Sequence, residues 1–286
     1  MPFIRKLNSD FIIENNCFKL SNTYLTDNIK KFKKITGTRF SAILGYNKFQ
    51  TPFKTWCQMV NIYSEKMDQT LAVVGQVIEP KIRDYVSQLL HVKFLSYNPI
   101  AIKWDAFAKV DDVFGGIPDG EPVDNNGNFI YKDGHPMLEI KTTSIDKLVY
   151  EKIDGCLQMK KDANGLPLIK TIGAKKAEWF DSNGQIVISN EYKLQLALYL
   201  YLRQVNNGLF AIAFLQTSDY ALPKNFQPSF ANVFTVKFCL KNGLQAIQSY
   251  IDKAREWYDK HIKTGISPQL TESDKIWLDE LKILPH

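Results

Sequence analysis

Residues 115–143 read GGIPDGEPVDNNGNFIYKDGHPMLEIKTT, and they contain the pattern on which the fold depends. The final part, MLEIKTT, alternates between two kinds of residue, as a β-strand with two different faces does. Glu139 and Lys141 then share one face of this strand. Asp119 precedes a glycine at the expected end of another strand, where the backbone can bend and direct the carboxylate outward. The stretch therefore predicts two carboxylates and one amine at one edge of a sheet.

Such a group of side chains suits a hard divalent cation. Mg²⁺ prefers carboxylate oxygens together with water and substrate phosphate, and a lysine beside the metal can orient and polarise a water molecule. The same residues also fit an exposed strand with a solvated Glu–Lys pair, because a chain with 30 acidic and 36 basic residues contains such combinations by chance. The rest of the sequence has to distinguish these two interpretations.

Composition places the chain among globular proteins of one or two domains. The 286 residues are 45% hydrophobic and 13% aromatic, which is enough for a sizeable core. The formal net charge of +6 is compatible with a polyanionic partner but does not require one. The first residues lack the apolar segment of a signal peptide, and no apolar run approaches the length of a membrane span. We therefore expect a cytoplasmic protein without a membrane partner.

The four cysteines show neither a CxxC pattern nor the spacing of metal ligands, because they are far apart in the sequence. Free thiols in a reducing compartment are the expected state. The four are Cys17, Cys57, Cys156 and Cys239.

Apolar periodicity and turn residues predict the order of helices and strands. Besides the strands near Asp119 and Glu139, strands are expected at 11–13, 92–95, 107–114, 209–215 and 233–239. Helices are expected from Thr36 or Thr38 to Gly45, from Thr51-Pro52 onward, and over 71–90, 191–205, 242–262 and 271–283. Turn signals of the hairpin type occur at 125–127 and 132–134. The helix at 191–205 would connect the strand at Glu139 to the strand at 209–215.

We interpret the chain as one domain overall. Residues 31–240 form the expected core, residues 1–30 an N-terminal extension, and residues 241–286 closing helices packed on the core. Residues 145–190 contain seven lysines and two turn signals, and we interpret them as an insertion. The insertion either contacts a nucleic acid backbone or is a solvated excursion.

Glu79 lies beside the apolar stripe of the helix expected at 71–90. Pro80 follows it and removes a backbone donor, so the helix is expected to begin or kink near this point. In one interpretation Glu79 belongs to the first turn of a helix, where the helix dipole favours a carboxylate. In the other it is a third acidic group directed at Asp119 and Glu139, because a carboxylate beside an apolar face needs a polar partner.

The segment KKFKKITGTR at 30–39 places cations and hydroxyl groups around a helix N-terminus. The unsatisfied amides and the dipole at such an end attract phosphate. A solvated basic loop is the other interpretation. The candidate phosphate-binding residues are Lys31, Lys34, Thr36, Thr38 and Arg39.

Five segments of the chain together resemble the phage-type alkaline exonucleases, the YqaJ and lambda-exonuclease branch of the PD-(D/E)XK nucleases. Their order and approximate spacing agree with that family, and the resemblance covers about two-thirds of the chain. The segments are ITGTRFSAILG (35–45), GQVIEP (75–80), GGIPDGE (115–121), LEIKTT (138–143) and YKLQLALYL (192–200).

The resemblance implies an α/β (α+β) fold with a PD-(D/E)XK restriction-endonuclease-like core, in which a mixed central sheet is flanked by helices. It implies that Lys141 positions the attacking water and that Gln195, on the following helix, supports the site. The implied metal-binding positions are Asp119, Glu139, Glu79 and the carbonyl of Ile140. Thr38 corresponds to a hydroxyl residue near the terminal 5′-phosphate. Lys31 stands where the lambda enzyme has an arginine, so the chain departs from the family pattern at this position. Lysine can still contact phosphate, but it cannot hold it bidentately as arginine does.

The function implied by the resemblance is a Mg²⁺-dependent deoxyribonuclease, with Mn²⁺ as a possible substitute. The expected reaction is 5′→3′ degradation of double-stranded DNA in phage or mobile-element recombination. A restriction-type endonuclease on the same core, and a DNA-binding module that has lost catalysis, are the alternatives. The family also implies a homotrimeric ring and a single-strand-annealing protein as a partner. An iron–sulfur cluster, present in some relatives, is not expected because the cysteines lack the required spacing.

Overall fold

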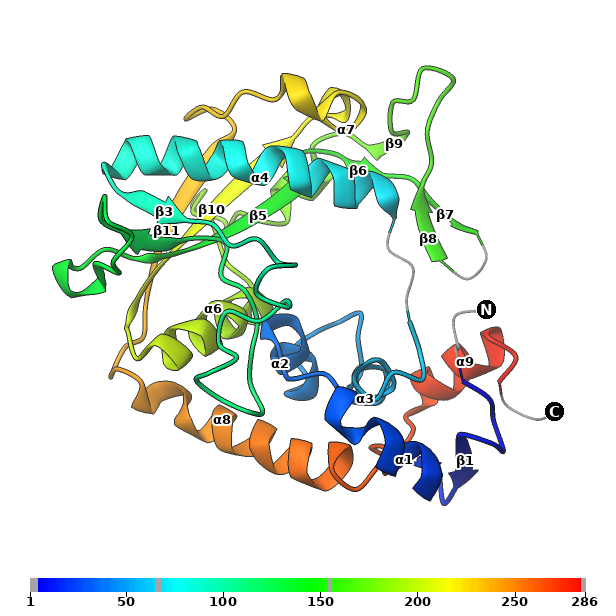
Figure 1. Ribbon diagram of the computed structural model, residues 1–286. Helices are drawn as coiled ribbons and strands as arrows, with labels where there is room; N and C mark the ends of the chain where they lie inside the picture. Colours follow the sequence, from blue (N-terminus) through cyan, green and yellow to red (C-terminus); the bar gives the residue numbers. More distant parts are fainter. Residues whose placement is uncertain (1–4, 65–67, 154–155, 284–286) are drawn as a thin grey trace.

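The computed structural model describes residues 5–64, 68–153 and 156–283 (Figure 1). Its central sheet has the strand order β11-β10-β5. β5 (Met137–Ser144) is parallel to β10 (Asn207–Leu215), and β11 (Val233–Cys239) is antiparallel to β10. Helix α6 (Asn190–Arg203) precedes β10 in the crossover that a parallel pair requires. The predicted fold class, a mixed sheet flanked by helices, is confirmed.

Different helices cover the two faces of this sheet. Leu138 and Ile140 of β5 share a buried cluster with Ile78 of α4 (Gln69–Leu90). The buried residues of α6 belong to a larger cluster on the opposite face. Figure 1 accordingly shows α4 on one side of the sheet and α6 with α8 (Gln245–Trp257) on the other. The period-two alternation of β5 therefore places Glu139 and Lys141 on one shared face, as predicted, and this face is the one that α6 covers.

The smaller helices begin where the sequence places capping residues. Thr51, which directly precedes Pro52 at the first helical position, accepts a hydrogen bond from the Lys54 amide. Thr271 forms a reciprocal capping pair with Asp274. The sequence predicts Thr51 as the first of these N-caps and either Thr271 or Ser273 as the second, and the structure has Thr271. The helices in question are α1 (Asn22–Asn28), α2 (Gly37–Ile43), α3 (Pro52–Met59) and α9 (Glu272–Glu280).

The two ends of the described chain pack together (Figure 1). A hairpin of β1 (Phe11–Glu14) and β2 (Cys17–Leu20) is joined to residues 265–270, because the Phe18 amide donates to Ser267 Oγ at 2.8 Å. Phe11 and Phe18 stack with their ring centroids 5.0 Å apart and are fully buried in the larger cluster. The described part of the expected N-terminal extension therefore contributes four buried side chains to the core, those of Phe11, Phe18, Leu20 and Tyr24. Residues 1–4 and 284–286 lie outside the described part.

The expected insertion at 145–190 consists of short paired strands and one short helix. β6 (Lys147–Leu148) pairs with β9 (Ile169–Thr171), and β7 (Tyr150–Ile153) pairs with β8 (Cys156–Met159). α5 (Ala174–Ala177) follows and packs against the sheet at β5. Cys17, Cys57 and Cys239 are free thiols, whereas the side chain of Cys156 in β8 lies outside the described residues.

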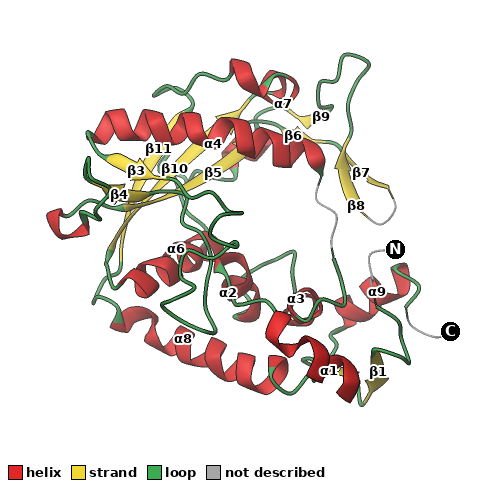
Figure 2. Ribbon diagram, in the orientation of Figure 1, coloured by secondary structure: helices red, strands yellow, loops and turns green. Residues whose placement is uncertain are grey.

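The strand predicted at 107–114 is wrong. β3 (Lys93–Leu95) pairs with β4 (Glu121–Val123), but residues 107–113 form turns and bends, drawn as loop in Figure 2, and Phe114 forms only an isolated bridge with Ile35. Asp105 Oδ1 accepts from the Phe107 amide, and Asp111 Oδ1 accepts from the amides of Val113 and Phe114. These side-chain oxygens satisfy the backbone donors that a strand partner would otherwise bind.

Two local predictions also need correction. Residues 131–133 form a 3₁₀ turn, η2 (Tyr131–Asp133), which ends at Gly134 with φ of 83°, instead of the predicted hairpin turn. α4 begins at Gln69 and continues through Pro80, so the helix does not begin near the proline. The hairpin turn expected at 125–127 is present, because Val123 pairs with Phe129 across it. None of the described helices has the length and apolar character needed to cross a membrane.

Candidate active site

Lys141 occupies the centre of a group of polar residues on the α6 face of β5. Its Nζ lies 2.7 Å from Glu139 Oε1 and 3.0 Å from Gln195 Oε1 of α6. It also lies 4.6 Å from the ring centroid of Tyr192, one helical turn before Gln195. The ammonium is thus held by a carboxylate, an amide oxygen and an aromatic face. The structure thus brings Glu139, Lys141 and Gln195 together.

Asp119 reaches the same place from the loop beside the β5 edge. Its Oδ2 accepts a hydrogen bond of 2.7 Å from the Ile140 amide. Its backbone carbonyl accepts a bond of 2.6 Å from Nε of Arg83 on α4. Gly120 forms an isolated antiparallel bridge with Leu138, which holds this loop against β5. The carboxylate and the carbonyl of Asp119 are therefore fixed by two different elements.

Glu79 approaches this edge from α4. Its Oε1 would lie 3.1 Å from a Cβ added at Gly75, so its side chain lies along the preceding helical turn. Burial and the charge of Asp119 raise its pKa to about 7, although Arg83 and Lys141 oppose the shift. Because α4 begins at Gln69, with Asp68 as its N-cap, and extends well beyond Glu79, the interpretation of Glu79 as a first-turn residue is wrong. Glu79 is instead electrostatically linked to the residues around β5.

The carboxylates of this group share a buried position of low polarity. Burial raises the pKa of Glu139 to about 8, with Lys141 opposing and Asp119 adding to the shift. Burial also raises the pKa of Asp119, despite the charge of Lys141. Burial alone would lower the pKa of Lys141, but the charges of Glu139 and Asp119 outweigh it and raise that pKa. Additional positive charge would therefore stabilise the ionised carboxylates.

The residues present fit a divalent cation. Glu139 is 1% exposed, and its Oε2 has no hydrogen-bond partner among the described residues. A buried carboxylate oxygen without a partner is costly unless a cation or donor binds it. The described residues contain no preformed group of three or more His, Cys, Asp or Glu side chains that could hold a metal. A site with Asp119 and Glu139 as its acidic ligands agrees with the one or two carboxylates that Mg²⁺ usually takes from a protein.

Close packing between α2 and α6 positions Gln195. A Cβ added at Gly37 would lie only 2.2 Å from Gln195 Cγ, so the two helices cross where glycine leaves room. One turn further along α6, the amides of Gly37 and Ile117 hydrogen-bond the buried hydroxyl of Tyr199. The N-terminal end of α2 is therefore joined to the helix that carries Gln195.

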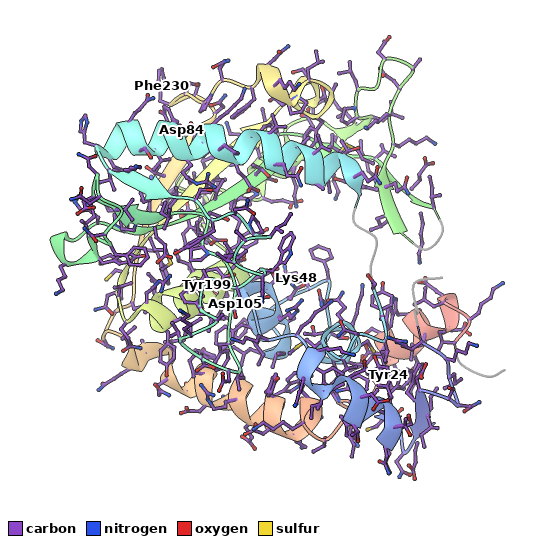
Figure 3. All side chains as sticks on the ribbon, in the orientation of Figure 1. Tyr24, Lys48, Asp84, Asp105, Tyr199 and Phe230 are labelled. Atoms are coloured by element: carbon purple, nitrogen blue, oxygen red, sulfur yellow. The ribbon has the colours of Figure 1, made fainter. Side chains whose placement is uncertain are left out.

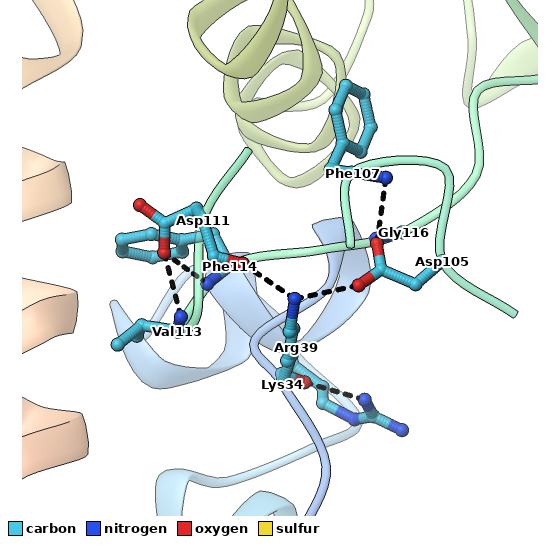
Figure 4. A network of polar contacts seen from close by, with 8 residues as sticks. All are labelled: Lys34, Arg39, Asp105, Phe107, Asp111, Val113, Phe114 and Gly116. Carbon is cyan, nitrogen blue, oxygen red and sulfur yellow. Dashed lines mark hydrogen bonds and ion pairs between the residues drawn. The ribbon is translucent and has the colours of Figure 1, made fainter. Parts of the chain in front are cut away.

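The residues expected to bind phosphate do not form one open cluster. Lys34 is 2.9 Å from Asp105 Oδ2, and it also donates to the Asp111 carbonyl at 2.6 Å (Figure 4). Arg39 donates to the Lys34 carbonyl at 2.7 Å, and burial lowers its pKa. Thr36 is the N-cap of α2 without a capping hydrogen bond from its side chain, and Thr38 and Lys31 are exposed. Phosphate binding by these residues stays a prediction, and for Lys34 it would have to displace an existing ion pair.

Three residues of the site were not anticipated from the sequence. Arg83 follows Glu79 by four residues on the same helical face, a spacing that is readable from sequence once Glu79 is suspected. Tyr192 precedes Gln195 by three residues and has the same kind of signal. The contact of Tyr199 with α2 had no signal, because it depends on the crossing at Gly37.

Comparisons with solved structures give only distant similarities. An alkaline exonuclease from Laribacter hongkongensis has a TM-score of 0.48 at 10% identity, covering 92% of this chain and 100% of that chain. A phage-related exonuclease from Haemophilus somnus has a TM-score of 0.45 at 12% identity, covering 82% and 98% respectively.

Sequence comparison gives closer matches. An uncharacterised protein of Mycoplasma genitalium is 51% identical over 280 residues, which covers 98% of this chain and 99% of the relative. Its homologue in Mycoplasma pneumoniae is 49% identical with the same coverage. Residues 29–203 match the family described as the YqaJ-like viral recombinase domain, and this segment includes every candidate site residue. The chain belongs to the YqaJ-like viral recombinase domain family.

Proposed function

We propose that the protein is a Mg²⁺-dependent deoxyribonuclease that degrades double-stranded DNA from an end in the 5′→3′ direction. The observation that carries this proposal is the buried Glu139 Oε2, which lies beside Asp119 and Lys141 and has no hydrogen-bond partner in the part of the chain that the structure describes. Membership in the YqaJ-like family supports DNA as the substrate. A positive net charge of +6 is compatible with such a polyanion.

Asp119 and Glu139 would hold the metal, and the Ile140 carbonyl and Glu79 would be further ligands. When bound, Mg²⁺ would supply charge stabilisation to the phosphodiester oxygens and polarise water. Lys141 uses two of its three N–H groups on Glu139 and Gln195, and the third has no hydrogen-bond partner among the described residues. That N–H can orient a water molecule for in-line attack, and the positive charge of Lys141 favours the deprotonated form of that water. Gln195 would keep the lysine in this orientation.

The deciding experiment uses linear and closed circular duplex DNA with the purified full chain. Linear DNA labelled at either strand end should be shortened from its 5′ ends when Mg²⁺ or Mn²⁺ is present, and chelation should stop the reaction. Glu139→Gln and Asp119→Asn should abolish cleavage while leaving the folded structure intact by circular dichroism. Full activity in excess chelator would contradict the assignment.

The same experiment separates the alternative functions. Cutting of closed circles would indicate a restriction-type endonuclease on this core. Binding without cleavage under all metal conditions would indicate a DNA-binding module. Comparing 5′-phosphorylated with 5′-hydroxyl ends tests the proposed role of Lys31, Thr38 and Arg39, because a terminal phosphate carries more charge than an internal one. Light scattering tests the proposed trimeric ring, and co-purification tests the proposed single-strand-annealing partner.

A further inference from the structure

The loop between α2 and α3 presents a phenylalanine to solvent. Phe49 is 86% exposed. The loop around it is nevertheless ordered by side-chain hydrogen bonds, because Asn47 Oδ1 accepts from the amides of Phe49 at 2.8 Å and Gln50 at 3.0 Å. The side chain of Gln50 in turn donates to Gln58 Oε1 at 2.7 Å. Phe49 is therefore held outward by a fixed loop.

This loop is attached to the helical turn that supports Lys141. Asn47 Nδ2 donates to Glu191 Oε1 at 2.8 Å. Glu191 lies in the first turn of α6, immediately before Tyr192, whose ring lies under the Lys141 ammonium. Burial raises the pKa of Glu191, whereas the charge of Lys141 lowers it, so the two side chains are close enough to interact. The loop consequently borders the candidate active site.

A cation accompanies the exposed ring. Lys48 precedes Phe49, and no ion pair or hydrogen bond engages its ammonium within the described part of the chain. Figure 3 shows Lys48 near the middle of the molecule, between α2 and the layer that contains α4. By contrast, Phe230, which is also 86% exposed, lies at the outer rim in the same view. Phe49 and Phe230 are therefore equally exposed but belong to different loops, the first between α2 and α3 and the second just before β11.

An exposed aromatic ring beside a free lysine has the chemistry of a platform for single-stranded nucleic acid. Every base has a π-face that can stack on such a ring, and the lysine can contact the neighbouring phosphate. We propose that Phe49 and Lys48 bind an unpaired nucleobase and its phosphate at the frayed end of the DNA beside the site. This inference rests on the proposed nuclease function, because it assumes that DNA enters at Lys141.

The test measures DNA binding in the presence of chelator, so that it does not depend on cleavage. The probe is a duplex with a short single-stranded end that carries 2-aminopurine, whose fluorescence falls on stacking. Phe49→Ala should weaken binding of this probe about 5- to 150-fold, the range of one base–aromatic stack. Phe49→Trp should retain binding and quench the probe. Phe230→Ala is the matched control and should bind like the wild type.

The outcomes separate this inference from the proposed function. Cleavage by the wild type, together with unchanged probe binding by Phe49→Ala, would overturn the platform and leave the nuclease standing. Loss of quenching in Phe49→Ala without any cleavage by the wild type would support the platform and reject the nuclease. A change of oligomeric mass in Phe49→Ala, measured by light scattering, would show that a second copy covers the ring and would overturn the inference. Thermal melting confirms that each variant is folded.

Discussion

The ammonium of Lys141 depends on neighbours from two elements, since Glu139 belongs to β5 and both Gln195 and Tyr192 belong to α6. If this ammonium orients the attacking water, Lys141→Ala should lower turnover about 10²- to 10⁴-fold, the range for a positioned proton-transfer group. DNA binding should change little, because only one cation is lost. Single-turnover rates and binding in chelator measure the two quantities separately. Turnover close to the wild-type value would assign Lys141 to a structural role only.

Arg83 contacts Asp119 through a single hydrogen bond, and we expect this bond to position the Asp119 carboxylate. Its Nε holds the Asp119 carbonyl, so Arg83→Met should let the Asp119 carboxylate shift and weaken metal affinity about 10- to 100-fold, as the loss of an outer-shell contact does. Metal titration of the variant by calorimetry measures this effect. Arg83→Lys should restore part of the affinity because it can still donate to the carbonyl.

A matched control for Arg83 lies on the same helix. Lys81 also donates to backbone carbonyls, but its acceptors are Lys224 and Phe226, away from Asp119. Lys81→Met should therefore leave metal affinity unchanged even if it lowers the melting temperature. Equal losses of affinity in Arg83→Met and Lys81→Met would show that α4 acts only through general stability.

At this scale the sequence predicts only part of the site. Asp119, Glu139 and Lys141 were predictable because strand periodicity and a Pro-Asp-Gly segment leave a readable pattern. The helical spacing places Arg83 on the same face as Glu79, but its hydrogen bond to the Asp119 carbonyl, 36 positions away, has no periodic signature in the sequence. The ion pair of Lys34 with Asp105 had no signal in the sequence either, and phosphate binding by this lysine stays a prediction.

The packing of helices against one another constrains which residues fit at their contacts, and the crossing of α2 over α6 at Gly37 is the clearest case. Gly37→Ala would place a Cβ 2.2 Å from Gln195 Cγ, so Gln195 must move away from Lys141. We expect a loss of about 1–3 kcal/mol in the free energy of unfolding, the usual cost of overpacking. We also expect turnover to fall at least tenfold. Denaturant unfolding and single-turnover assays measure the two effects.

The double variant Gly37→Ala with Gln195→Ala separates packing from catalysis. Removing Gln195 Cγ makes room for the new methyl group, so the double variant should regain stability relative to Gly37→Ala alone. Turnover should stay low, because Lys141 still lacks its amide partner. Recovery of both stability and turnover would show that Gln195 has no part in positioning Lys141.

Helices were predictable to a greater extent than the segments between them. Those at 71–90 and 191–205 follow a clear 3.6-residue period, and Thr51 and Thr271 mark helix starts by their capping chemistry. The ion pair between Glu121 and Arg203 had no such signal. The carboxylate of the fully buried Glu121 accepts two hydrogen bonds from Arg203, at 2.6 and 2.7 Å, and so joins β4 to the end of α6. Composition does not reveal such a long-range pairing.

The whole molecule joins the two ends of the chain to the core that supports the site. Phe18 is packed edge-on against Phe53 of α3, with ring centroids 4.9 Å apart. The insertion is tied to the start of α4, because the Met159 amide donates to Asp68 Oδ2 at 2.7 Å, and to α9 by the exposed pair of Lys152 with Glu280. Such an exposed pair contributes little energy. The burial of Phe18 is therefore expected to contribute more to stability than the exposed pair of Lys152 with Glu280.

The pH dependence of stability reports on the whole molecule through its buried acids. The pKa values of Glu79 and Glu139 are about 7 and about 8 in the folded chain, whereas an unfolded glutamate has a pKa of about 4.3. Between these values the folded state binds more protons than the unfolded state, so stability falls as pH rises through this window. In chelator, the free energy of unfolding should therefore decrease between pH 6.5 and about pH 8, by up to about 1.4 kcal/mol per pH unit for each proton. Denaturant titrations at several pH values measure it.

Adding Mg²⁺ should reverse this trend, because a cation beside the carboxylates favours their ionised form and removes the excess bound protons. Glu139→Gln should flatten the dependence in chelator and should also abolish the stabilisation by Mg²⁺, since it removes the buried carboxylate, one oxygen of which has no hydrogen-bond partner among the described residues. Glu256→Gln, which removes an exposed carboxylate from α8, is the control and should change neither. Working above pH 6.5 avoids His261, whose pKa burial lowers. If stability in chelator rose with pH in the wild type, the buried acids would not be coupled as the structure indicates.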